Sequence, residues 1–268
     1  MAQPFNSSKL RGLILDMDGV VWQTLNPLGD LPSIFSEIDR RGWRVILATN
    51  NATRTPDQYL DKLARFGVHL EPWQVINSAQ AAAHYLKERH PQGGRVFVVG
   101  ESGLIEILER QGFHNNYEGA LAVVAALDRA VTYEKLRRAT LLIRQGIPFI
   151  GTNPDRTFPT PEGQIPGAGS IIAALEAATG VEPTIIGKPQ PYMYKIALER
   201  LGTSPAETLV VGDRLETDIA GAQNAGCPCA LVLSGVSTLE AARAWEPAVD
   251  LIADDLGSLL ESLNEAER

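Results

Sequence analysis

Short apolar runs alternate along the chain with stretches of helical periodicity, and this alternation limits the possible folds more than any other feature. The first apolar run, residues 13–15, leads to a helical stretch at residues 33–41 and then to a second run at residues 45–47. Strands that alternate with helices specify a mainly parallel sheet. The sequence therefore predicts an α/β fold. Further strands are predicted at residues 96–99, 121–127, 148–151, 184–186, 208–212, 230–233 and 251–253, and further helices at residues 55–66, 104–111, 134–145, 215–225 and 239–245, with a last helix near the C-terminus.

Composition and charge exclude several classes of function. Lysine and arginine total 24 against 32 aspartate and glutamate residues, which gives a net charge of −8. Because the chain has no basic field, neither nucleic acid nor an acidic membrane is expected as a partner. The apolar runs are shorter than the roughly 18 residues that span a bilayer, and residues 1–9 lack the apolar stretch of a signal peptide. Two cysteines, Cys227 and Cys229, are too few for a disulfide scaffold, so a cytoplasmic protein is expected.

Two aspartates follow the first predicted strand, at the edge where parallel sheets bind their ligands. Asp16 ends the apolar run and Asp18 comes two residues later, so on an extended chain both carboxylates face the same side. Carboxylates held this close repel each other unless a cation or a proton neutralises them. A divalent metal bound by oxygen ligands would do so, and Asp213, which ends another strand, could supply a third ligand. The alternative for Asp16 and Asp18 is a helix cap followed by a turn.

Polar residues also follow three other predicted strands. Thr49, Asn50 and Asn51 offer a hydroxyl and two amides suited to an anion's oxygens, although a capping cluster before the next helix explains them equally well. Lys188 could place a positive charge beside a phosphate, or could be an ordinary solvated lysine. Asp218 falls in the first turn of a helix, where the helix dipole alone accounts for an acidic residue. Four such signals at four strand ends favour a phosphate site held by a metal.

Taken together, these residues resemble the motifs of the haloacid dehalogenase superfamily, in its form with an aspartate nucleophile that acts as a phosphatase. The order of the motifs in the chain is that of the family. The long interval between the second and third motifs is similar to the class IIA arrangement, in which an α/β cap domain is inserted into a Rossmann-like, doubly wound core. The resemblance implies a core of residues 1–75 and 185–268 and a cap of residues 76–184. The matching residues are Asp16-Met17-Asp18-Gly19-Val20 for the first motif, Thr49 for the second, Lys188 for the third, and Gly212-Asp213 with Asp218 for the fourth.

Three further segments resemble one branch of class IIA, the p-nitrophenyl phosphatases and phosphoglycolate phosphatases. These segments are residues 50–55, residues 152–155 with residues 158–159, and residues 187–189. The resemblance implies hydrolysis of small-molecule phosphate monoesters with Mg²⁺ as cofactor. Pyridoxal-phosphate phosphatases of the class tend to carry a histidine where Phe158 stands, which argues against that substrate.

The resemblance also implies a role for each motif residue. Asp16 would attack phosphorus to form an aspartyl phosphate, and Asp18 would protonate the leaving alcohol and then deprotonate the attacking water. Mg²⁺ would be held by Asp16, by the backbone carbonyl of Asp18 and by Asp213, with Asp218 acting mainly through water. The phosphoryl oxygens would be bound by Thr49, Asn50, Asn51 and Lys188.

Substrate choice is expected from the cap, because the core motifs handle only the phosphate. The candidate specificity residues are Asn153, Asp155 and Phe158, in an irregular stretch rich in proline whose alternative is a structural loop. A turn at residues 100–103 has the form of an anion site, but an ordinary cap-domain turn is favoured. A homodimer through the cap is a further possibility. Two other functions stay open, a phosphotransferase or mutase that passes the phosphoryl group to a sugar and a non-catalytic protein that binds a phosphate ligand.

Overall fold

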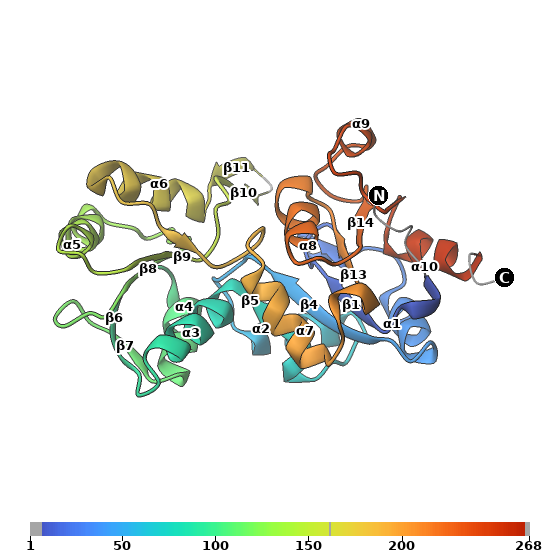
Figure 1. Cartoon of the computed structure of the whole chain (residues 1–268), viewed down its shortest axis with the longest axis horizontal. Helices are drawn as coiled ribbons and strands as arrows, with labels where there is room; N and C mark the ends of the chain where they lie inside the picture. The colour runs from blue at the N-terminus through green and yellow to red at the C-terminus, as the bar shows by residue number, and fades with distance from the viewer. Residues whose placement is uncertain (1–6, 161, 266–268) are drawn as a thin grey trace. The chain divides into compact units, whose positions relative to one another are not determined.

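The computed structural model describes residues 7–160 and 162–265, and the chain forms two compact units (Figure 1). We call them the core unit and the insert unit. The core unit comprises Met1–Thr49, Asp57–Ile76 and Pro189–Arg268, and the insert unit comprises Asn50–Pro56 and Asn77–Lys188.

The core unit is built on a sheet of six strands in the order β15-β14-β13-β1-β4-β5. The strand β1 pairs in parallel with β13 on one side and with β4 on the other, and all four of its residues are buried. A parallel strand in the middle of a sheet is covered on both faces, which is why its sequence is an uninterrupted apolar run. The strands are β1 (Gly12–Leu15), β4 (Arg44–Thr49), β5 (Val75–Asn77), β13 (Thr208–Gly212), β14 (Cys229–Val232) and β15 (Leu251–Ala253), with a small hairpin of β2 (Trp22–Gln23) and β3 (Asn26–Pro27).

Helices cover both faces of this sheet, as a doubly wound fold requires. On one face, helices α1, α2 and α10 share a continuous apolar core with the strands, and α1 contacts α10. Helix α7 contacts β1 and β4. The helices are α1 (Leu31–Arg40), α2 (Pro56–Arg65), α7 (Tyr192–Leu201), α8 (Ala220–Asn224), α9 (Leu239–Arg243) and α10 (Leu256–Glu265), with 3₁₀ turns at Ser7–Lys9, Pro72–Gln74 and Pro205–Glu207 and a π-helix at Leu215–Ile219.

The insert unit has its own parallel sheet, in the order β12-β9-β8-β6-β7, and its own apolar core. Figure 1 shows most of this unit in teal, green and yellow, with α5 beside α6. Both sheets alternate with helices along the chain, which confirms the predicted α/β fold. The elements are α3 (Ser78–Arg89), β6 (Gly94–Val99), α4 (Ser102–Arg110), β7 (Phe113–Asn115), β8 (Val123–Ala125), α5 (Tyr133–Arg144), β9 (Phe149–Gly151), β10 (Thr157–Thr160), β11 (Gly163–Pro166), α6 (Ala168–Thr179) and β12 (Thr184–Ile185).

Some elements differ from the sequence-based expectation. The stretch at residues 152–167, expected to be irregular, contains the antiparallel hairpin of β10 and β11, in which Phe158 lies opposite Ile165. The single helix expected at residues 215–225 is divided into the π-helix Leu215–Ile219 and helix α8. Helix α3 was not among the predicted elements, although Asn77 and Gln80 form a capping box at its start. In residues 7–160 and 162–265 the structure contains no helix with the length and apolarity needed to cross a membrane.

Candidate active site

Three carboxylates of the core unit converge beyond the carboxyl ends of two adjacent strands. Asp16 follows β1, Asp213 follows β13, and Asp218 lies in the π-helix; each offers an oxygen within 4.8 Å of the others. Asp213 and Asp218 are both only 2% exposed. Because buried like charges at this separation repel strongly, the arrangement requires a cation or shared protons. An all-oxygen donor set of this kind suits a hard divalent metal.

The surroundings of Asp213 explain why the chain carries glycines near it. The backbone N–H of Val236 donates to Asp213 Oδ2 over 2.8 Å. A Cβ on Gly235 would overlap this carboxylate, and one on Gly19 would lie 2.5 Å from Oδ2. Gly19 also has a φ of 87°, a conformation that side chains disfavour. Two glycine turns therefore let the backbone close tightly around Asp213.

Asp218 is held by the turn that carries it. Its Oδ2 accepts a hydrogen bond of 3.1 Å from the backbone N–H of Arg214, and its carbonyl accepts one of 3.1 Å from the Tyr194 hydroxyl. A Cβ on Gly212 would overlap the Asp218 side chain. The extra residue in the π-helical turn thus places this carboxylate back against the end of β13.

Asp18 has a partner that the sequence analysis missed. The indole Nε1 of Trp22 donates to Asp18 Oδ1 over 2.9 Å, while the Gly19 N–H donates to the Trp22 carbonyl over 2.7 Å. Trp22 is 1% exposed and stacks on Tyr59 with ring centroids 6.3 Å apart. Asp18 itself is exposed, so its carboxylate is both oriented and accessible. No motif marks Trp22, and its only signal is its position four residues after Asp18.

Thr49 ends β4 and is buried in the core unit, whereas Asn50 and Lys188 belong to the insert unit. Asn50 Oδ1 accepts a hydrogen bond of 2.8 Å from the Lys188 N–H, and Asn50 Nδ2 donates to the Lys188 carbonyl over 3.0 Å. Lys188 is only 2% exposed. The structure thus brings together two residues that the sequence analysis chose independently.

Two further candidate residues of the insert unit, Asn153 and Asp155, contact Asn50. Asn153 Nδ2 donates to the Asn50 carbonyl over 2.8 Å, and Asn50 Nδ2 lies 3.3 Å from Asp155 Oδ2. Asn51 Oδ1 instead accepts from the N–H and the hydroxyl of Thr53, over 2.9 and 2.7 Å. Phe158, on β10, is partly buried. Asn153 and Asp155 are therefore part of one hydrogen-bond network with Asn50.

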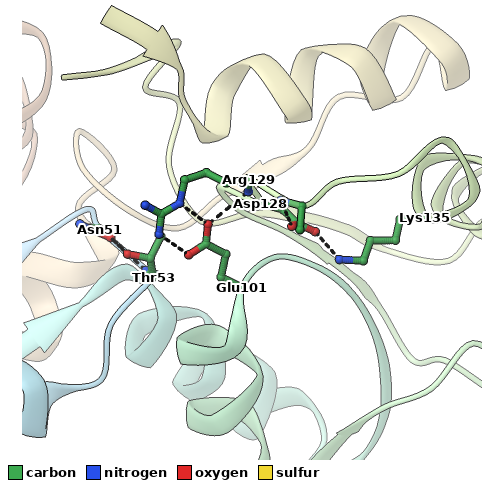
Figure 2. Close-up of polar contacts among 7 residues, drawn as sticks. Asn51, Thr53, Glu101, Asp128, Arg129 and Lys135 are labelled. Atoms are coloured by element: carbon green, nitrogen blue, oxygen red, sulfur yellow. Dashed lines mark hydrogen bonds and ion pairs between the residues drawn. The ribbon is translucent and has the colours of Figure 1, made fainter. Parts of the chain in front are cut away.

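The turn at residues 100–103 already holds a carboxylate. Figure 2 shows that Glu101, the N-cap of α4, binds the Arg129 guanidinium. The bonds from Arg129 Nε and Nη2 are each 2.7 Å long, and the Arg129 N–H adds one of 3.1 Å. Hydrogen bonding to Arg129 lowers the pKa of Glu101, so this side chain is ionised at neutral pH. A helix N-terminus that carries its own carboxylate attracts no second anion, which favours the interpretation as an ordinary turn.

Comparison with known proteins decides the family. A model of the haloacid dehalogenase-like hydrolases matches residues 13–114, and a second haloacid dehalogenase hydrolase-like model matches residues 185–259. An acid sugar phosphatase of Staphylococcus aureus is 38% identical over 231 residues, which cover 86% of this chain and 89% of that protein. The chain belongs to the haloacid dehalogenase-like hydrolases.

Solved structures place this hydrolase among the phosphatases of the family. A 4-nitrophenylphosphatase from Thermotoga maritima superposes with a TM-score of 0.91 at 33% identity, over 96% of this chain and 98% of the other. A glycerol phosphate phosphatase from Mycobacterium tuberculosis, solved with magnesium, gives a TM-score of 0.87 at 36% identity, over 94% of this chain and 77% of the other. These relatives confirm the assignment to the class IIA phosphatases that the motifs supported, and with it the expectation of an enzyme.

Proposed function

We propose that this hydrolase releases inorganic phosphate from small-molecule phosphate monoesters through an aspartyl phosphate formed on Asp16. The observation that carries the proposal is the convergence of Asp16, Asp213 and Asp218 within 4.8 Å, with the exposed Asp18 two residues after Asp16 in the chain. The printed names of the relatives, which include acid sugar, 4-nitrophenyl and glycerol phosphate phosphatases, support a small monoester as the substrate.

The donor set fits Mg²⁺, which would be held by the Asp16 carboxylate, the Asp18 backbone carbonyl and Asp213, with Asp218 reached through water. Bound there, Mg²⁺ would neutralise negative charge and let an anionic nucleophile approach an anionic phosphate. The glycine turns around Asp213 and the π-helical turn that carries Asp218 keep these oxygens in place before substrate arrives.

Asp16 and Asp18 take part in both half-reactions. In the first, Asp16 forms a bond to phosphorus while the bond to the leaving oxygen breaks, and Asp18 gives that oxygen its proton. In the second, Asp18 takes a proton from water, whose oxygen attacks phosphorus and releases Asp16. The hydrogen bond from Trp22 keeps the Asp18 carboxylate in one orientation during both proton transfers.

The phosphoryl oxygens are assigned to Thr49, Asn50, Asn51 and the ammonium group of Lys188. Preorganised donors of this kind stabilise the charge of the transition state. We assign substrate selection to the insert unit acting as a cap, with Phe158 on its β10–β11 hairpin and the loop of Asn153 and Asp155. A homodimer through this unit and a cytoplasmic location stay predictions.

The test is phosphate release from a panel of monoesters, measured with Mg²⁺ and with EDTA. The panel contains p-nitrophenyl phosphate, phosphoglycolate, sugar phosphates, glycerol phosphate and nucleoside monophosphates. We expect release that requires the metal, and its distribution over the panel identifies the preferred leaving group. If a folded, metal-loaded protein released the leaving alcohol, such as p-nitrophenol, only when a sugar or alcohol acceptor was added, and without free phosphate, the phosphoryl group would have passed to the acceptor. Phosphotransfer would then replace hydrolysis as the function.

A further inference from the structure

The side chain of Asn50 joins two places where the chain passes between the units. One passage lies between Thr49 and Asn50, and another lies between Lys188 and Pro189. Asn50 bonds to both backbone groups of Lys188, accepting from its N–H over 2.8 Å and donating to its carbonyl over 3.0 Å. Lys188 is therefore fixed to the residue that directly follows Thr49.

Asn50 is itself held from several sides. Its carbonyl accepts hydrogen bonds from Ser78 Oγ over 2.6 Å and from Asn153 Nδ2 over 2.8 Å. Asn50, Asn153 and Lys188 are 8%, 6% and 2% exposed, so these bonds lie in a region of low dielectric, where they are stronger and where breaking one leaves a polar group unsatisfied.

Gly187 makes the close approach possible. A Cβ at this position would lie 2.6 Å from Asn50 Oδ1 and would overlap the carbonyl of Thr152. The Gly187 N–H donates to that same Thr152 carbonyl over 2.9 Å. The backbone before Lys188 is thus bonded to the Thr152 carbonyl. The Asn50 amide fits against this backbone only because residue 187 lacks a side chain.

The chemistry of the amide matters as well as its shape. Asn50 Oδ1 is an acceptor for Lys188, and Nδ2 donates to the Lys188 carbonyl and approaches Asp155 Oδ2 at 3.3 Å. An aspartate of the same size would keep the acceptor but lose both donor contacts, and it would bring a second carboxylate against Asp155. Both polar atoms of the Asn50 side chain are thus bonded within the insert unit.

We propose that Asn50 is a positioning residue, whose side chain holds Lys188 where its ammonium group meets the phosphoryl oxygens. The inference rests on the proposed function, because it takes Lys188 as a phosphate ligand. Lysine is a point charge on a flexible stem, so its backbone must be fixed for its charge to be delivered reproducibly. A displacement of about 1 Å in a reacting group costs on the order of 100-fold in rate.

A double-mutant cycle of Asn50→Ala, Lys188→Ala and the double variant tests this role. The readouts are kcat and KM for p-nitrophenyl phosphate with Mg²⁺, and the inhibition constant of inorganic phosphate. We expect Asn50→Ala to lower kcat/KM about 10- to 100-fold and to weaken inhibition by phosphate. In the Lys188→Ala background the same change should have less than about a threefold effect, because the two residues act as a unit. Independent, multiplicative losses would overturn the proposal.

Two further variants separate positioning from folding. Asn50→Asp has nearly the same volume, so it leaves no cavity if Asn50→Ala fails to fold. Because its carboxylate loses two donor contacts and faces Asp155, we expect a thermal midpoint below that of the wild type, a protein still folded at the assay temperature, and a loss of phosphate affinity. Asn116→Ala is the matched control, since Asn116 Oδ1 also bonds a backbone N–H of the insert unit, that of Glu118 at 2.9 Å. Activity of Asn50→Asp equal to that of Asn116→Ala would contradict the proposal.

The activity of the wild-type protein shows whether the proposed function or only the role of Asn50 is wrong. A folded wild type that releases no phosphate from any monoester with Mg²⁺ contradicts the proposed function and this inference with it. A wild type that is active, with multiplicative losses in the cycle, contradicts only the role of Asn50.

Discussion

At the scale of single residues, the site depends on side chains that orient the reacting groups. Trp22 donates to Asp18 over 2.9 Å, and Lys62 Nζ lies 3.8 Å from the centre of the Trp22 ring. Tyr59 stacks on the same ring. The indole N–H therefore has a fixed position, and it restricts the rotation of a carboxylate that is otherwise exposed.

We expect Trp22→Phe to lower kcat for p-nitrophenyl phosphate about tenfold, because it removes the N–H but keeps an aromatic ring against Tyr59. A hydrogen bond to a charged group contributes about 1.5–3 kcal/mol, which corresponds to roughly this factor or more. Steady-state kinetics with a thermal-melting control checks the expectation. Trp73→Phe, at an exposed tryptophan on the 3₁₀ turn Pro72–Gln74, should leave kcat unchanged. An equal loss in both variants would refute a role for the indole N–H.

Asp16→Asn should reduce turnover with Mg²⁺ by at least about 1,000-fold, because an amide is a poor nucleophile and a weaker metal ligand. The matched control is Asp39→Asn, an exposed aspartate on α1 of the same unit. Turnover is measured at saturating Mg²⁺ and substrate, so that weaker binding of the metal does not contribute to the loss. Turnover within tenfold of the wild type would exclude covalent catalysis by Asp16.

The two thiols should be inert in the folded protein. Burial raises the pKa of Cys227 and Cys229 from an ordinary value of 9.0 to about 12. The native state therefore keeps the neutral thiols, and this contribution to stability is fully present below pH 9 and is lost as the pH rises towards 12. At pH 8 we expect an aromatic disulfide reagent to label neither thiol until guanidinium unfolds the chain. Rapid labelling of the native protein would contradict this.

At the scale of elements, the end of β13 and the π-helix after it together position the carboxylates of Asp213 and Asp218. Gly212 is the last residue of the strand, Asp213 follows it, and Asp218 returns to pack where a Gly212 side chain would be. The π-helical turn supplies the residue that makes this return possible.

We expect Gly212→Ala to displace Asp218, destabilising the fold by about 1–3 kcal/mol through overpacking and weakening Mg²⁺ affinity. Gly257→Ala, on helix α10, is the matched control. A Cβ at Gly257 would lie 3.4 Å from Asp255 Oδ1, which is an ordinary van der Waals distance. That control should be neutral or slightly stabilising, since alanine favours a helix over glycine. Urea unfolding and metal titration measure both effects, and equal behaviour of the two variants would contradict the packing argument.

At the scale of the whole molecule, each unit has its own sheet and its own apolar core. Asparagine side chains join the segments where the chain changes units: Asn50 bonds Lys188, and Asn77 Nδ2 donates to the Arg54 carbonyl over 2.8 Å. The catalytic carboxylates belong to the core unit alone. Metal binding should therefore stabilise mainly the core unit.

We expect Mg²⁺ at about 100 times its dissociation constant to stabilise the core unit by about 2.7 kcal/mol, because only the folded state assembles the three carboxylates. Hydrogen exchange in Mg²⁺ and in EDTA should show added protection in β1 and β13 and little change in β6 and β8. Asp213→Asn should abolish the difference. A shift that persists in this variant would indicate that the ion binds elsewhere.

Much of the fold and several residues of the candidate site could be predicted from the sequence alone. Apolar runs and helical periodicity are local patterns. The strand that ends just before Asp16 and the strand that ends just before Asp213 could therefore be predicted from the sequence. The residues after parallel strands meet at one edge of a sheet whatever the details of packing. This geometric rule is why Asp16 and Asp213 could be chosen together, whereas Asp218 is added through the resemblance to the family. The structure brings all three within 4.8 Å of one another.

The tertiary structure alone decided how those groups are held. Asn50 and Lys188 are 138 residues apart, and no periodicity connects their types or their spacing. The Trp22 indole reaches Asp18 because a tight turn at Gly19 reverses the chain. In the β10–β11 hairpin, which no periodicity indicated, Phe158 lies opposite Ile165. Sequence patterns record the burial and the local conformation of each residue, whereas hydrogen bonds between distant segments depend on a packing that only the folded chain creates.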